Sequence, residues 1–93
     1  METEVDVRLG PETKFCKILT EIIEAAILKR YLNPGIAVGN YFDEVKNIMH
    51  TIVPGPYELT TVVHSNSGDG SSCHLIIYDD QSPEAMLWKL KYL

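Results

Sequence analysis

The sequence predicts an α+β domain: an N-terminal strand, two amphipathic helices, and an antiparallel β-sheet on which those helices pack. Three observations lead to this prediction. Residues 3–10 alternate between polar and apolar, two stretches repeat apolar residues at helical spacing, and residues 57–93 combine β-branched runs with turn-forming residues. The 93 residues, of which 45% are hydrophobic, suffice for one domain, residues 1–93, with a single modest core.

The first predicted element is a strand over the segment TEVDVRLG. Apolar and charged side chains alternate along it, which is typical of a strand with one buried face. The apolar set is Val5, Val7 and Leu9, and the charged set is Glu4, Asp6 and Arg8. Gly10 ends the strand, and Pro11 suits the first position of a helix because its missing N–H would have no helical partner there.

Two helices are predicted next, over residues 12–31 and 36–52. Both segments repeat apolar residues every three or four positions, which places those residues on one face of a helix. The first stripe contains Phe15, Ile18, Leu19, Ile22, Ile23, Ala26 and Ile27, and the second contains Val38, Tyr41, Phe42, Val45, Ile48, Met49 and Ile52. The segments NPG and PGP end the two helices, because a residue before proline disfavours the helical conformation.

Three strands are predicted for the remainder, over YELTTVVHS, CHLIIYDD and AMLWKLKYL. The first two are rich in β-branched residues, which favour strands. The third places Met86, Trp88, Leu90 and Tyr92 on one side, after the turn-forming segment DDQSPE. Trp88 suits either a core position or a binding interface.

The charge and cysteine content exclude several classes of protein. The net charge is −5 and no basic cluster exists, so we expect no nucleic-acid partner. The N-terminus is acidic, and the longest near-apolar stretch, residues 22–28, is too short to span a membrane, so we expect a cytoplasmic protein without a membrane partner. Without a secretory signal, Cys16 and Cys73 are expected to be reduced thiols, with Cys16 buried and inert.

The segment HSNSGDGSSCH, residues 64–74, is the strongest candidate for chemistry. Its glycines precede serines that lead into a strand, unlike a phosphate-binding loop, in which a Lys-Ser/Thr pair follows the glycines and opens a helix. A calcium loop would need glutamate where Ile76 stands. The simplest interpretation is a glycine-rich turn between two strands, since Asp-Gly and Ser-Gly pairs supply the positive φ of tight turns.

A small thiol- or metal-dependent enzyme remains an alternative, built on His64, Cys73 and His74. A zinc ion needs three or four such ligands, and an imidazole can activate a thiolate. However, Cys73 and His74 are adjacent on a strand and should point to opposite faces of the sheet. We therefore expect no metal, no cofactor and no enzymatic activity.

The order and length of the elements resemble the eight-kilodalton dynein light chain family. The resemblance covers nearly the whole chain. It rests on EVDVRLGPETKF for the opening strand, EAAILKRYLN for the end of the first helix, GIAVGNYFDEVKNIM for the second helix, and LTTVVHSNSG, HLIIYDD and AMLWKLK for the strands. The signal lies in order, spacing and partial matches.

The resemblance implies a non-enzymatic interaction hub in the cytoplasm, associated with the cytoskeleton as part of a microtubule motor complex. Members are homodimers in which one strand crosses to the partner subunit, and extended segments of client proteins, dynein intermediate chain among them, add to a sheet edge. The corresponding edge or dimer contact here contains Val62, Val63, His64, Ser65, Asn66, Ser67, Gly68, Asp69, Gly70, Ser71 and Ser72. By position, its helical wall contains Gly35, Val38 and Gly39.

The chain departs from the family in that same region. The family's crossing strand would occupy NSGDGSSC, which is shorter and has no β-branched or aromatic residue. Asn33 and Pro34 stand where the family has an acid and a lysine that contact the client. The Tctex type of light chain is a neighbouring possibility, which shares Ser-Ser-Cys before a strand. A structural subunit that packs against one large partner is a further alternative.

Overall fold

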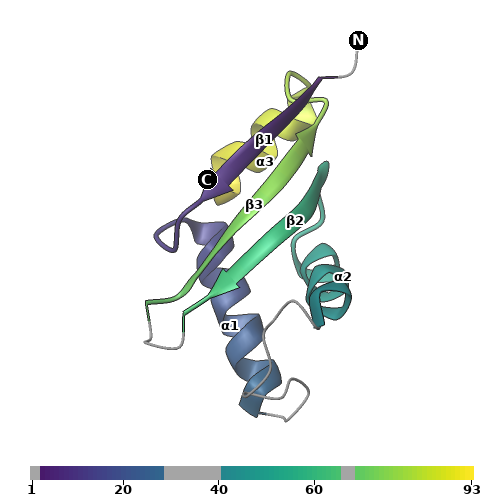
Figure 1. Cartoon of the computed structure of the whole chain (residues 1–93). Coiled ribbons are helices and arrows are strands. Elements are labelled where there is room, and N and C mark those ends of the chain that lie inside the picture. The colour runs from purple at the N-terminus through teal and green to yellow at the C-terminus, as the bar shows by residue number, and fades with distance from the viewer. Residues whose placement is uncertain (1–2, 29–40, 66–68) are drawn as a thin grey trace.

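The computed structural model describes residues 3–28, 41–65 and 69–93. In chain order these form β1 (Glu4–Leu9), α1 (Lys14–Leu28), α2 (Phe42–Ile52), β2 (Tyr57–His64), β3 (Ser71–Tyr78) and α3 (Pro83–Tyr92). The strands make one antiparallel sheet in the order β1-β3-β2, so β3 is central (Figure 1). The α+β fold class predicted from the sequence is confirmed.

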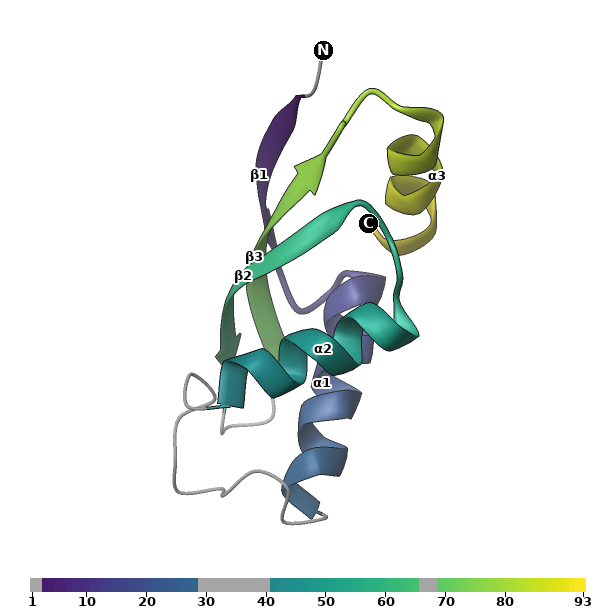
Figure 2. The ribbon, with the colours of Figure 1, turned by 90° about the vertical axis from the view of Figure 1, so that its right-hand side faces the viewer.

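One face of the sheet is covered by helices. Figure 2 shows α1 and α3 on the same side of the strands, and α1 also contacts α2. In β3 every second residue is buried, and the alternate residues Ser72, His74, Ile76 and Tyr78 lie on the open face. The core fills the space between sheet and helices, and its largest fully buried side chains are Phe15, Leu19, Ile23, Met49, Leu59, Leu75 and Ile77.

An aromatic cluster closes the core under α3. The ring of Trp88 lies 5.7 Å from that of Phe15, 4.9 Å from that of Tyr57 and 5.4 Å from that of Tyr92, measured between centroids. Trp88 is only 5% exposed. The sequence left open whether Trp88 lies in the core or at a binding interface, and the structure places it in the core.

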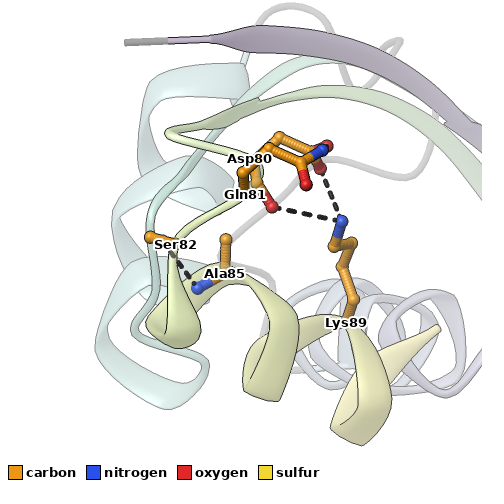
Figure 3. Close-up of polar contacts among 5 residues, drawn as sticks. All are labelled: Asp80, Gln81, Ser82, Ala85 and Lys89. Atoms are coloured by element: carbon orange, nitrogen blue, oxygen red, sulfur yellow. Dashed lines mark hydrogen bonds and ion pairs between the residues drawn. The ribbon is translucent and has the colours of Figure 1, made fainter. Parts of the chain in front are cut away.

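The predicted closing strand is wrong, because residues 83–92 form the helix α3. Ser82 caps this helix: its hydroxyl accepts a hydrogen bond from the Ala85 amide at 3.1 Å, as Figure 3 shows. Pro83 follows in the first turn, where proline is favoured. The buried residues Ala85, Trp88 and Tyr92 are spaced by three and four, which is the helical period that the apparent alternation concealed.

The other predicted elements are confirmed where the structure describes them, with shifted ends. The first helix begins at Lys14 rather than at residue 12, and the predicted residues 29–31 lie outside the described part of the chain. The second helix begins at Phe42, while residues 36–40 also lie outside it. The β1 strand and the two β-branched strands form where they were predicted, but of the expected buried face of β1 only Leu9 is buried and Val5 is 37% exposed.

Candidate functional site

The outer edge of β2 is the candidate binding site. Within the described residues, β2 pairs only with β3, so its other edge faces no strand. The Ser65 amide donates to the Gly70 carbonyl at 3.0 Å, and His64 stands opposite Ser71 in the next pair. Because hydrogen-bonded and non-hydrogen-bonded pairs alternate in an antiparallel ladder, Val62 and His64 direct their backbone N–H and C=O groups away from β3.

The Ser71 backbone supports this assignment of the ladder. Its amide does not pair with β2 but donates to the Thr20 hydroxyl of α1 at 2.9 Å. That hydroxyl in turn donates to the Cys16 carbonyl at 2.8 Å. The Ser71 hydroxyl, fully buried, lies 2.8 Å from Nδ1 of His64. These contacts hold the end of the β2–β3 hairpin on α1 and so position the edge.

The side chains along the edge alternate between the two faces of the sheet. Val62 is half-buried and packs against the core, whereas Val63 is 60% exposed on the open face. A register shift between Leu59 and Thr61 interrupts the ladder further back along β2. The regular part of the edge is therefore residues 61–65.

The connection between β2 and β3 is a direct hairpin closed by the Ser65–Gly70 hydrogen bond. Gly70 has a φ of +94°, which a residue with a Cβ rarely adopts. Asp69 is exposed. Of the predicted site residues, Asn66, Ser67 and Gly68 lie outside the described part of the chain, as do Gly35, Val38 and Gly39.

Ser71 and Ser72, which the sequence grouped with the edge, belong to the central strand. They pair with His64 and Val63 of β2, so they lie one strand behind the outer edge. Ser71 is fully buried. A partner segment at the edge would reach the backbone of residues 61–65 rather than these serines.

The alternative thiol or metal site is not assembled. Cys73 and His74 lie on opposite faces of β3, as their adjacency predicted. His64 contacts Ser71, while His74 Nδ1 lies 3.9 Å from Asp6 Oδ1 on the open face. In residues 3–28, 41–65 and 69–93, no three His, Cys, Asp or Glu side chains gather as metal ligands would.

Cys73 instead pairs with Cys16, with 3.6 Å between their sulfur atoms. The hydrogen bond between the two thiols lowers the pKa of Cys16. The same hydrogen bond, together with burial, raises the pKa of Cys73. Both side chains are buried, which withholds the sulfur atoms from any substrate in solution. The predicted burial of Cys16 is confirmed.

A polar cluster that the sequence did not reveal joins α2 to the sheet. The Lys46 ammonium donates to Glu58 Oε1 at 2.8 Å, and the Tyr78 hydroxyl donates to Glu58 Oε2 at 2.5 Å. These two donors hold the pKa of Glu58 below its ordinary value. The three residues come from α2, β2 and β3, so no local sequence pattern could have shown their association.

Comparisons with protein-family models, with curated proteins and with solved structures found no match to this chain. Across the described residues, no helix is long and apolar enough to cross a membrane.

Proposed function

We propose that this chain is a non-enzymatic protein-interaction module that binds extended segments of partner proteins along the outer edge of β2. The observation that supports this most is the outward direction of the Val62 and His64 backbone groups on a strand with one unpaired edge among the described residues. An unpaired edge is a template for another strand and must be covered, blocked or used.

A partner segment would bind by adding a fourth strand beside β2. Its backbone would exchange hydrogen bonds with Val62 and His64, which supplies affinity without selecting a sequence. Val63 is exposed on the open face next to this edge. It would contact those partner side chains that point to the same face of the sheet, and so contribute selectivity. The register shift behind Thr61 limits the regular contact to a short segment.

The resemblance to dynein light chains supports the same proposal through the order strand, helix, helix, strands, although α3 stands where that family has its closing strand. Homodimer formation, clients that include dynein intermediate chain, and association with a microtubule motor and the cytoskeleton belong to this proposal. Because β3 follows β2 directly, a crossing strand would have to form within residues 65–70, which connect the two strands.

The test is a titration of the ¹⁵N-labelled protein with an extended peptide from dynein intermediate chain, the client that the resemblance implies. We expect amide shift changes concentrated on residues 61–65. Val62→Pro should abolish them, because it removes an outward N–H while leaving the β2–β3 hydrogen bonds in place. Val62→Thr, which keeps both the amide and a β-branched side chain, is the matched control and should bind like the parent protein.

Amide shifts on other surfaces, or equal binding by the Val62→Pro and Val62→Thr variants, would count against the β2 edge. Binding to neither the parent protein nor the control would count against this client. A scrambled peptide of the same composition separates backbone-directed binding from recognition of side chains.

A further inference from the structure

The helix α3 has a second apolar face that the core does not use. Ala85, Trp88 and Tyr92 pack inward. On the opposite side, Leu87 is 68% exposed and Leu90 is 85% exposed. The complete outer face consists of Met86, Leu87, Leu90 and Leu93, spaced as neighbours on one side of a helix. Contiguous exposed apolar patches on monomeric proteins are often functional.

This outer face contains a hollow of about 290 Å³, lined by Met86, Lys89 and Leu90. Lys89, which forms one wall, is held in place: its ammonium donates to Asp80 Oδ1 at 2.6 Å and to the Asp80 carbonyl at 3.3 Å (Figure 3). Lys89 is therefore held at the border of the apolar face, and the hollow beside it is open to solvent.

The charges beside this face are arranged symmetrically. Glu84 and Lys91 are both exposed and lie seven residues apart on one flank of the helix, on either side of its midpoint near Leu87. Two antiparallel copies of α3 related by a two-fold axis would place each Glu84 level with Lys91 of the second copy. Within the described part of the chain neither side chain has an ion-pair partner, and the Lys91 ammonium lies 5.3 Å from the centroid of the largely buried Tyr92 ring.

We propose that the outer face of α3 binds a second copy of this chain, with the two helices antiparallel. Met86, Leu87 and Leu90 of each copy pack against the same apolar face of the other. Glu84 of each copy pairs with Lys91 of the other, so the contact contains two identical ion pairs. This interface lies on α3 and is independent of the β2 edge.

The same arrangement explains how two chains of net charge −5 could meet. Repulsion between them is smallest where the local charge is balanced, and α3 carries Glu84 against Lys91, with Lys89 neutralised by Asp80. The contact area falls at the low end for specific interfaces, so the dimer should be weak, with a dissociation constant in the micromolar to millimolar range. It should form as the concentration rises.

The first test is sedimentation equilibrium of the whole chain over a wide concentration range. We expect a reversible dimer for the parent protein and at least tenfold weaker association for Leu87→Glu, which places a carboxylate in the apolar contact between the two helices. Asn47→Glu on the exposed face of α2 adds the same single negative charge elsewhere, and should associate nearly like the parent. Far-UV circular dichroism checks that each variant is folded.

The second test uses the symmetry of the ion pairs. Glu84→Lys alone and Lys91→Glu alone each convert both ion pairs into repulsive contacts, so each variant should associate several-fold more weakly than the parent. An equimolar mixture of the two variants restores both ion pairs in a heterodimer, which should form with nearly the parent affinity. A parallel arrangement would place Glu84 opposite Glu84 and Lys91 opposite Lys91, so it predicts single variants that associate like the parent and a mixture that associates more strongly than the parent.

A monomer at every concentration would overturn the proposal. A dimer that Leu87→Glu leaves unchanged would also overturn it, because another surface, such as the β2 edge, would then make the contact. Failure of the mixture to associate more strongly than its components would refute the antiparallel pairing.

Discussion

Gly55, in the loop between α2 and β2, provides a sharp test of how tightly Trp88 is held. A Cβ added at Gly55 would lie 2.5 Å from Trp88 Nε1 and would also overlap the neighbouring Cδ1 atom. Its backbone does not have the positive φ that excludes alanine, so Gly55→Ala tests the contact alone. The indole cannot easily move aside, since the rings of Phe15, Tyr57 and Tyr92 surround it.

The expected cost follows from two opposing effects. Forcing an extra methyl group into a packed core costs about 1–3 kcal/mol. Replacing glycine by alanine stabilises by roughly 0.4–1 kcal/mol, because it restricts the unfolded chain. We therefore expect Gly55→Ala to lower the free energy of unfolding by about 1–2 kcal/mol, which in a domain of this size lowers the melting temperature by roughly 10 °C.

The assay is urea unfolding followed by circular dichroism, with Gly10→Ala as the matched control. A Cβ at Gly10 would overlap both carboxylate oxygens of Glu12, with Oε1 2.7 Å away and Oε2 nearer still, but this carboxylate is the end of an exposed, flexible side chain. Gly10→Ala should therefore be neutral or slightly stabilising. Trp88→Ala supplies the second half of a double-mutant cycle, because it removes every ring atom that a Cβ at Gly55 would overlap.

In the Trp88→Ala background, Gly55→Ala should cost less than about 0.5 kcal/mol, since the overlapping ring atoms are gone. Equal costs in the two backgrounds would refute the reasoning, because the destabilisation would then come from the backbone of the loop. A neutral Gly55→Ala in the parent protein would show that Trp88 is not confined by its aromatic neighbours.

Three further predictions concern single contacts. Ser82→Ala removes the cap of α3 and should lower the free energy of unfolding by about 1 kcal/mol, with Ser82→Asp close to the parent protein in the same urea experiment. Thr20→Val leaves the buried Ser71 amide without its acceptor and should cost about 1–3 kcal/mol, whereas Thr20→Ser should be much milder; equal losses would contradict this role. Lys46 and the Tyr78 hydroxyl lower the pKa of Glu58 below its ordinary value of 4.5. The ionised Glu58 therefore stabilises the fold above pH 4.5, and this stabilisation is lost as the pH falls below that value. In this acidic range the urea midpoint of Glu58→Gln should depend less on pH than that of the parent.

Several elements could be predicted from the sequence because their signals are local. The alternation around Val5 and Val7 specifies a strand, and the repeat of Phe15, Leu19 and Ile23 specifies the buried face of a helix. The adjacency of Cys73 and His74 sufficed to predict that they point to opposite faces, since side chains alternate along any strand. These conclusions required no knowledge of which elements meet.

The error in α3 shows where local patterns become ambiguous. In a short segment that is apolar on two sides, alternation and helical spacing fit almost equally well, and the sequence around Trp88 fits both. The Ser82–Pro83 start was the signal that favoured a helix, and packing of Trp88 among three aromatic rings selects the buried face. Once Trp88 is buried, Leu87 and Leu90 lie on the opposite, outer face of α3.

Composition, charge, the period of each strand and the burial of Cys16 are properties of the chain itself, because neighbouring residues determine them. The order of the strands, the outward direction of the Val62 and His64 backbone groups, and the contact of Glu58 with Lys46 and Tyr78 were decided by the tertiary structure. They depend on which segments distant in the chain pack side by side. Hydrophobic burial drives that packing but acts without direction, so no local sequence pattern encodes its outcome.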